Sequence, residues 1–591
     1  MKNFEEILKY IKQDPYQLAA YQNNNSLVIK AGPGSGKSTV LSLKLARLLK
    51  EKVHSPRKVA CITFSNEATS SLERKVKNIV EPNERHYFIS TIHSFCLSQI
   101  LKPFVKLFNY GIKEDFRIIS DIEKKDIVRK IKEQIGIPDK EVTLTEMDKE
   151  RTYLISGLSQ IQIENYDLAL KVAVAYEKHL IKNNLVDFIS IVKISTQMIQ
   201  NESYIRKCLE ARFPWILIDE YQDLGKPLHE MVLCLTKYTR IKMIAVGDPD
   251  QSIYGFNGAI PDFFEELVKK SSFDVIELRH NYRSEQKILD ESSKVLNLQQ
   301  KYISKAKVNK TAEINLIKCN RNQEDQYKYI VDNLIPNCIK NCIPYGEIAI
   351  LLSSKEKLKN CMEHLISKNI PYYISNKEYP RTQLIIWLED CMAWLIKTRN
   401  IHFQDIFKQW LSIKSYKPSH FNEINKEKTQ LYRILIESIK LSNNLLDWLK
   451  YIYINLEIKK SLQGSPRYSE NFEGFKSLYV SVKKGDNVNL SMDEFSVSGI
   501  QGNKVALLTR HSSKGLEYEV IILPFVEDGS IPNFYNFQDE KKMEEEKRIL
   551  FVCLTRAKTT CYLLMSKKMN GYPKKLSRFL DDFNFDTIVD L

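Results

Sequence analysis

Short apolar runs alternate with helix-length stretches along the first half of the chain. Residues 26–31 contain the run Leu27-Val28-Ile29, and similar runs rich in β-branched side chains occupy residues 58–63, 215–219 and 241–247. Runs of this length are typical of buried strands, and the stretches between them have helical spacing. The alternation predicts a parallel sheet covered by helices on both faces.

A second series of strand-like runs follows at residues 347–352, 505–509, 520–523 and 561–565. Two intervening stretches are helical and poor in strand signals. We therefore predict an α/β chain with two parallel-sheet cores. The first core comprises residues 1–96 and 188–280, with a helical insertion at 97–187, and the second comprises residues 281–380 and 501–591, with a reduced helical insertion at 381–500.

Composition and charge add a partner class and a location. The 591 residues contain 88 Lys and Arg against 73 Asp and Glu, a net charge of +15. This balance suits a polyanion such as nucleic acid, although a solvated Lys-rich surface has the same composition. Because the cysteines are scattered singly and no apolar run reaches about 18 residues, we expect a cytoplasmic protein without a membrane span.

A glycine-rich loop directly follows the first apolar run. Residues 31–38 read AGPGSGKS, and a helical pattern comes next. In a phosphate loop, small residues let backbone N–H groups surround phosphate oxygens at a helix N-terminus, a lysine reaches the outer phosphates and a hydroxyl ligates Mg²⁺. The residues predicted to contact the nucleotide here are Ala31, Gly32, Pro33, Gly34, Ser35, Gly36, Lys37, Ser38 and Thr39.

Two carboxylates end the apolar run at residues 215–219. Asp219 and Glu220 follow the sequence ILI at 216–218, and side chains at the carboxyl edge of a parallel sheet face a bound ligand. We predict that Asp219 and Ser38 hold Mg²⁺ and that Glu220 polarises the attacking water. A strand that simply ends in polar residues is the alternative interpretation.

Residues 219–223, DEYQD, resemble the DExQD box of the UvrD/Rep/PcrA-like superfamily 1A DNA helicases, and further motifs of that family occur in order. Together they extend from Gln17 to about Phe579, nearly the whole chain. The matching segments are TFSNEA at 63–68 (motif Ia), STIHSF at 90–95 (the TxH motif), VGDPDQSIY at 246–254 (motif III), NYRS at 281–284 (motif IV), HSSKGLE at 511–517 (motif V) and LTRA at 554–557 (motif VI).

The resemblance implies two RecA-like cores, 1A and 2A, with insertions 1B and 2B, and an ATP site with Mg²⁺ divided between the cores. Lys37 and Glu220 would act from the first core. Arg283 and Arg556 would act from the second, where guanidinium groups stabilise the charge that develops during phosphoryl transfer. By the same resemblance, further contacts to the nucleotide come from Gln251 at the γ-phosphate, Gln17 and Tyr282 at adenine, and Glu517.

Single-strand binding requires aromatic faces for bases and cations for phosphates. The resemblance places a DNA track along Phe64, Asn66, His93, Tyr254, Phe256, His511 and Tyr572. Core packing is the alternative for each aromatic residue. Residues 527–535 lie where the family carries a strand-separating hairpin, and an exposed aromatic side chain there would act as a wedge, whereas a plain turn would not.

Two departures from the family pattern bear on function. Phe256-Asn257 replaces the usual Trp-Arg, which removes stacking surface and a cation, and the second insertion is shorter than usual. We predict an ATP-dependent helicase that moves on single-stranded or tailed duplex DNA, 3′ to 5′ as in the family, in DNA repair or antiviral defence. The alternative is a DNA-sensing ATPase subunit that signals to a separate nuclease or other protein subunit and unwinds poorly alone.

Overall fold

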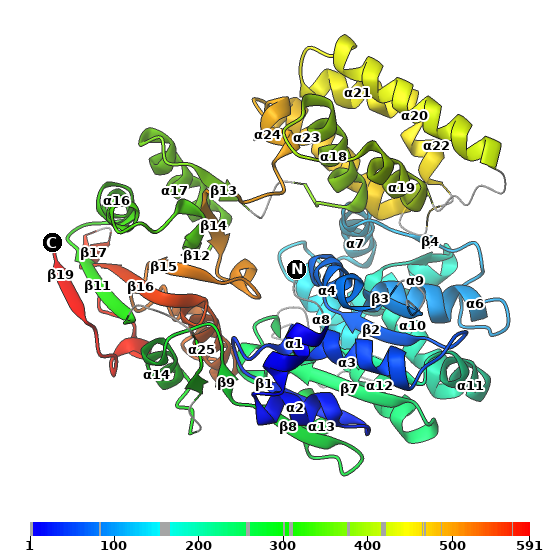
Figure 1. Ribbon diagram of the computed structural model, residues 1–591, viewed down its shortest axis with the longest axis horizontal. Helices are drawn as coiled ribbons and strands as arrows, with labels where there is room; N and C mark the ends of the chain where they lie inside the picture. The colour runs from blue at the N-terminus through cyan, green and yellow to red at the C-terminus, as the bar shows by residue number, and fades with distance from the viewer. Residues whose placement is uncertain are drawn as a thin grey trace. The chain divides into compact units, whose positions relative to one another are not determined.

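The computed structural model describes residues 4–81, 84, 86–153, 166–255, 260–299, 302–306, 311–374, 379–414, 421–463, 465, 468–485, 487–569 and 571–591. The chain forms two compact units. The first unit is made of Met1–Tyr329 together with Ser513–Leu591, and the second of Ile330–Ser512. Figure 1 shows the helices and strands of both units.

The first unit contains a sheet of six parallel strands in the order β3-β2-β6-β7-β1-β8. All four apolar runs predicted as strands in the first half of the chain are confirmed. β1 lies between β7 and β8, so the glycine-rich loop starts inside the sheet rather than at its edge. The strands are β1 (Leu27–Ala31), β2 (Val59–Thr63), β3 (Tyr87–Thr91), β6 (Trp215–Ile218), β7 (Lys242–Gly247) and β8 (Asp274–Leu278).

Helices cover both faces of this sheet, as predicted. Leu27 and Ile29 of β1 pack on one face with helices α1 to α4, which Figure 1 shows (blue) beside β1 and β2. Val28 packs on the other face with α10 and α12, because successive side chains of a strand point to opposite faces. The helices are α1 (Phe4–Ile11), α2 (Pro15–Gln22), α3 (Lys37–Glu51), α4 (Asn66–Ile79), α5 (Ile92–Phe95), α10 (Phe188–Asn201), α11 (Ser203–Arg212), α12 (Lys226–Tyr238) and α13 (Asp262–Val268).

The described residues between 97 and 187 are mainly helical, as predicted, and have a small core of their own. Arg151 is completely buried, and its guanidinium Nη1 lies 2.6 Å from Oδ2 of Asp187. Asp187 also caps the N-terminus of α10, so a buried ion pair joins this stretch to a helix of the sheet. The elements are α6 (Lys102–Phe104), α7 (Asp121–Ile135), α8 (Leu144–Tyr153), α9 (Tyr166–Lys182), β4 (Arg117–Ile118) and β5 (Leu185–Val186).

The rest of the first unit contributes four parallel strands. β15 (Tyr518–Pro524) pairs with β16 (Ala557–Ser566), β16 pairs with β11 (Glu313–Cys319), and β11 pairs with β19 (Thr587–Asp590). Two short pairs accompany them, β9 (His280–Asn281) with β10 (Ile303–Ser304), and β17 (Lys568–Met569) with β18 (Tyr572–Pro573). The helices are α14 (Gln286–Val295), α15 (Gln323–Tyr329) and α25 (Glu540–Leu554).

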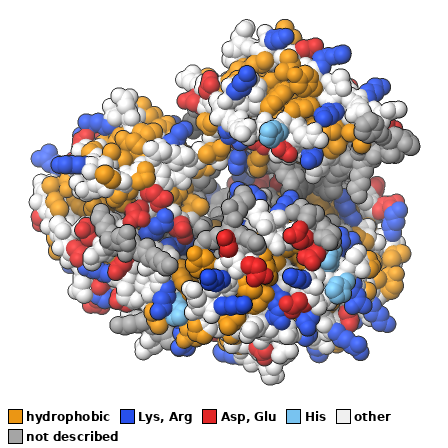
Figure 2. Space-filling model, viewed as in Figure 1, with side chains coloured by type: hydrophobic (Ala, Val, Ile, Leu, Met, Phe, Trp, Pro, Cys, Tyr) orange, Lys and Arg blue, Asp and Glu red, His pale blue; other side chains and the backbone are white. Residues whose placement is uncertain are grey.

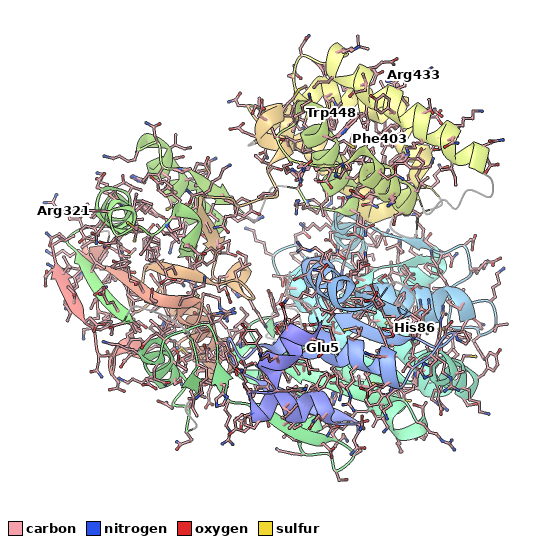
Figure 3. The ribbon with its side chains drawn as sticks, in the orientation of Figure 1. Glu5, His86, Arg321, Phe403, Arg433 and Trp448 are labelled. Carbon is pink, nitrogen blue, oxygen red and sulfur yellow. The ribbon has the colours of Figure 1, made fainter. Side chains whose placement is uncertain are left out.

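The second unit contains three parallel strands and a group of helices. β12 (Ile348–Leu352) pairs with β14 (Val505–Thr509), which pairs with β13 (Tyr372–Ile374). The helices share a core in which Trp387 stacks on Trp410, and Figure 3 labels Trp448 inside this group. They are α18 (Gln383–Ile396), α19 (Phe403–Lys414), α20 (Phe421–Leu441), α21 (Leu445–Asn455), α22 (Ile458–Leu462), α23 (Tyr468–Lys484) and α24 (Met492–Ser496); α16 (Ile335–Lys340) and α17 (Lys355–Ser367) precede them.

Parallel strands with covering helices occur in both units, which confirms the predicted fold class. The boundaries of the two cores and their two insertions, as given in the sequence analysis, remain predictions. Figure 2 shows Lys and Arg side chains interspersed with Asp and Glu over the visible surface. In the part of the chain that the structure describes, no helix combines the length and apolarity needed to cross a membrane.

Candidate nucleotide and nucleic-acid sites

The glycine-rich loop has the backbone that a phosphate loop needs. Ala31 ends β1, and Lys37, Ser38 and Thr39 form the first turn of α3. Gly34 and Gly36 have φ values of +62° and +81°, a region that favours glycine. A Cβ atom on Gly34 would lie 2.7 Å from the Cβ of Arg283. Glycine is therefore required where the loop turns toward the helix N-terminus, which favours anions.

The environment of the Lys37 side chain is that of an anion-binding residue. Its ammonium nitrogen is buried and, among the residues that the structure describes, has no hydrogen-bond partner. The nearest carboxylate oxygen, Oε1 of Glu220, lies 3.9 Å away. Because an ammonium group buried without a hydrogen bond costs free energy, a phosphate oxygen at this position would stabilise the protein. This observation shows that the loop fits an anion such as a phosphate group.

Asp219 and Glu220 follow β6, and the pKa values of their carboxyl groups are shifted in opposite directions. Burial and the neighbouring Glu220 carboxylate raise the pKa of Asp219 to about 6. Burial also raises the pKa of Glu220, but Lys37 and Lys514 outweigh it and bring the pKa to about 2. Gln222 Nε2 donates to Oε2 of Glu220 over 2.5 Å. Asp219, together with the Ser38 hydroxyl, thus offers oxygen ligands suited to Mg²⁺. Glu220 is a carboxylate fixed by a hydrogen bond and suited to orienting water.

Lys514 is a site residue to which sequence reasoning assigned no role, although it lies within the segment matching motif V. Its ammonium donates to Oδ2 of Asp223 over 2.5 Å and to the backbone oxygen of Gln251 over 2.7 Å. It also lies 3.8 Å from Oε2 of Glu220. Lys514 therefore contacts two segments that precede it in the chain by 291 and 263 positions, at Asp223 and at Gln251.

Both predicted arginines lie in the same unit as the loop. Arg556 is buried, and its Nη2 donates to Oε1 of Gln251 over 3.1 Å. Burial and the charge of Arg283 lower the pKa of Arg556 to about 9. Arg283 Nε donates to Oε2 of Glu517 over 2.8 Å. Arg283 and Glu517, both predicted to contact the nucleotide, therefore contact each other in this structure. The structure brings Gln251, Arg283 and Arg556 to the region of the phosphate loop.

Gln17 and Tyr282, the residues predicted to contact adenine, both touch the loop. Gln17 Nε2 donates to the backbone oxygen of Ser35 over 2.8 Å, and the backbone N–H of Tyr282 donates to the oxygen of Gly34 over 2.8 Å. The side-chain amide of Asn281, a residue with no role predicted from the sequence, donates to the backbone oxygen of Pro33 over 2.6 Å. The loop is therefore held from both sides.

Two predicted DNA contacts form an aromatic pair. The rings of Phe64 and Tyr254 stack with centroids 5.2 Å apart and an interplanar angle of 27°, and both side chains are half-buried. Lys514 Nζ lies 5.3 Å from the centroid of the Tyr254 ring. Asn66 is exposed at the first position of α4. A half-buried aromatic pair beside a cation is a surface on which a nucleic-acid base can stack.

The other predicted DNA contacts are not part of this pair. His93 meets the ring of Phe188 at 5.1 Å, and burial lowers its pKa to about 4, so it is neutral at pH 7. Tyr572 is 74% exposed on β18. His511 is half-buried in the second unit. Phe256, with Asn257, lies outside the described residues.

The segment 527–535 carries exposed aromatic side chains. Phe534 is 65% exposed and Tyr535 is 88% exposed, and the ring of Phe534 contacts that of Phe537 at 5.4 Å. A β-bridge between Ser530 and Asn533 closes a tight turn just before them. The structure therefore has the exposed aromatic side chain that a strand-separating wedge requires.

Comparisons with known proteins identify the family. The model for the UvrD/REP helicase N-terminal domain matches residues 13–272, and the model for the UvrD-like helicase C-terminal domain matches residues 276–444 and 486–568. The chain belongs to the UvrD/Rep family of helicases, which confirms the resemblance seen in its motifs.

Individual relatives are similar over almost the entire chain. A probable DNA helicase II homolog of Mycoplasma capricolum is 27% identical, with 93% of this chain and 84% of the relative covered. The ATP-dependent DNA helicase Rep of Buchnera aphidicola is 26% identical, with 94% of each chain covered. The ATP-dependent DNA helicase PcrA of Staphylococcus epidermidis is 24% identical, with 95% of this chain and 85% of the relative covered.

Proposed function

We propose that this chain is an ATP-dependent helicase that moves 3′ to 5′ on single-stranded DNA and separates the strands of a tailed duplex. The family and the names of the relatives support the reaction class. The observation that carries the mechanism is the position of Lys514, whose ammonium contacts Asp223 and Gln251 and also lies 5.3 Å from the ring centroid of Tyr254. We call Lys37, Ser38, Asp219 and Glu220 the phosphate end of the site. The Lys514 side chain connects this phosphate end with the aromatic pair of Phe64 and Tyr254.

The residues at the phosphate end divide the work of hydrolysis in this proposal. Lys37 neutralises oxygens of the outer phosphates. Glu220 is ionised at neutral pH because its pKa is about 2, so it orients the attacking water and accepts its proton. Ser38 and Asp219 would hold Mg²⁺, which would supply charge neutralisation at the phosphates.

ATP hydrolysis is coupled to DNA binding through Arg556 and Lys514. Both contact Gln251, and Lys514 also lies beside Tyr254 of the aromatic pair. Arg556 exchanges the amide oxygen of Gln251 for a phosphate oxygen when the triphosphate is present, and returns to it after hydrolysis. Because Lys514 contacts Gln251 and lies beside Tyr254, each exchange alters how firmly the aromatic pair is held. Alternation between two such states during repeated hydrolysis moves the protein along a strand.

Two assays on the isolated chain test the proposal. ATP turnover is measured with and without single-stranded DNA, and strand displacement is measured on duplexes that carry a 3′ or a 5′ tail. We expect DNA to stimulate turnover and only the 3′-tailed duplex to be opened. Turnover that ignores DNA would overturn the proposal, and opening of only the 5′-tailed duplex would overturn the direction. Stimulation without displacement would favour the alternative, a sensing ATPase that requires a separate nuclease or another subunit.

A further inference from the structure

Asp14 caps the helix that carries Gln17. The residue immediately precedes Pro15, and its Oδ1 accepts hydrogen bonds from the backbone N–H groups of Tyr16 over 2.8 Å and of Gln17 over 3.1 Å. Only 2% of Asp14 is exposed. An aspartate before a proline at the first helical position is a strong N-terminal signal, because the carboxylate satisfies backbone donors that lack partners within the helix.

The second oxygen of the same carboxylate has a different partner. Oδ2 of Asp14 accepts a hydrogen bond from the hydroxyl of Tyr282 over 2.6 Å and lies 3.1 Å from Nδ1 of His280. The ring of Tyr16 meets the ring of His280 edge to face at 5.3 Å. One buried carboxylate therefore connects the start of α2 with the segment that follows β8, 268 positions away.

The two residues that Asp14 connects are fixed to the phosphate loop at their other ends. Gln17 Nε2 donates to the oxygen of Ser35, and the N–H of Tyr282 donates to the oxygen of Gly34. The side chain of Tyr282 is otherwise 44% exposed, so the hydroxyl bond to Asp14 is what restrains its ring from the far end. The separation between the Gln17 amide and the Tyr282 ring thus depends on Asp14.

We infer that Asp14 is a positioning residue for recognition of the purine base of the nucleoside triphosphate. It fixes the Gln17 amide, which would read the edge of the base, relative to the Tyr282 ring, which would stack on its face. The inference rests on the proposed ATP-dependent function. Both oxygens of Asp14 are already engaged by protein groups, so loss of the carboxylate should affect nucleotide binding and base selection rather than the chemical step.

Two substitutions separate this role from the capping role. In Asp14→Asn, the remaining carbonyl oxygen still caps α2, since asparagine is as good an N-cap as aspartate. The amide nitrogen can only donate, so the charge-assisted bond from the Tyr282 hydroxyl to the carboxylate is lost and can be replaced only by a weaker N–H···O bond. In Tyr282→Phe the ring is kept and the same hydrogen bond is removed from the other side. Asp121→Asn, at an exposed position of α7, is the matched control.

The measurements are equilibrium binding of fluorescent ATP and CTP analogues and the KM and kcat for ATP with single-stranded DNA present. We expect each substitution to weaken ATP binding and raise KM about tenfold, with kcat changed less than about twofold and the preference for ATP over CTP reduced. Because both substitutions act on the same bond, which Tyr282→Phe removes completely, the double variant should bind ATP no more weakly than Tyr282→Phe. Asp121→Asn should match the parent.

Three outcomes would overturn the inference. They are unchanged ATP binding and base preference in Asp14→Asn, losses that add to about a hundredfold in the double variant, and a fall in kcat without a change in binding. If Asp14→Asn fails to fold, Tyr282→Phe alone decides through the same base preference. A parent chain that binds ATP selectively but shows no DNA-stimulated turnover would contradict the proposed function and leave the binding test of Asp14 intact.

Discussion

The phosphate end of the nucleotide site and the aromatic pair lie on either side of Lys514 and are built from opposite kinds of side chain. At the phosphate end, Lys37 and Glu220 face each other with their charges largely removed from water. At the other end, Phe64 and Tyr254 are half-buried rings that stack on each other. Buried charges interact strongly and depend on every partner, whereas stacking energies are moderate and add up. Chemistry should therefore fail sharply on a single change, and DNA binding should fail gradually.

The largest effect is expected from Glu220→Gln. The amide keeps the size of the side chain but cannot accept a proton from water, so turnover with DNA should fall about 10²–10⁴-fold while ATP binding is retained. Steady-state turnover and equilibrium ATP binding check this, with Glu540→Gln, at an exposed position of α25, as the control. A loss of only a few fold would place the chemistry elsewhere and break the comparison.

A graded effect is expected from Tyr254→Ala. Removal of the ring takes away one stacking surface, worth about 1–3 kcal/mol, so affinity for single-stranded DNA should fall about 10- to 100-fold. Titration with a labelled oligonucleotide measures the affinity. Tyr254→Phe keeps the ring and should remain close to the parent. If the phenylalanine variant binds DNA as weakly as the alanine variant, stacking is not the source of the affinity.

The connection itself is tested by Lys514→Met, which keeps the length of the side chain and removes its charge. We expect the factor by which DNA stimulates turnover to fall about tenfold, because the contacts to Asp223 and Gln251 are lost together with the cation beside Tyr254. The ratio of turnover with and without DNA measures this, and Lys541→Met is the exposed control. An unchanged ratio would mean that the two regions communicate by another route.

The smallest effect is expected from Tyr535→Ala. An exposed side chain makes little contribution to folding, so stability and DNA-stimulated turnover should stay within about twofold of the parent. Strand displacement from a tailed duplex should slow about threefold if this residue serves as the wedge. Tyr238→Ala, at an exposed tyrosine of α12, is the control. Equal displacement rates for Tyr535→Ala and the parent would make the turn a plain one.

Local patterns predicted the parts of the fold in which neighbouring residues share one environment. The sequence VIKAGPGSGK carries an apolar strand, a glycine-rich turn and a helix start within ten positions, and all three are present. β8 and β19 were missed because most of their residues are exposed or half-buried, so they have no apolar run. Edge strands of this kind are defined by their partners, which sequence spacing does not reveal.

Contacts between distant segments explain what was missed at the site. Asp14 and Tyr282 are 268 positions apart, and Lys514 and Asp223 are 291 positions apart. The Asp-Pro pair at residues 14–15 indicates a helix N-cap, but nothing nearby indicates that the second oxygen of the carboxylate binds a tyrosine. Motif matching located the segments that meet, whereas only the folded chain shows which atoms of those segments touch.

The buried pair of Arg151 and Asp187 has a consequence for motion within the first unit. Arg151 Nη1 and Asp187 Oδ2 are 2.6 Å apart and almost inaccessible to water, and Asp187 is the N-cap residue of α10. Removing one partner of such a buried pair costs about 3–5 kcal/mol, and separating α8 from α10 would break the same pair. A separated state would therefore be a minor one, populated at about 1% or less, so α8 and α10 should move together in nearly all molecules.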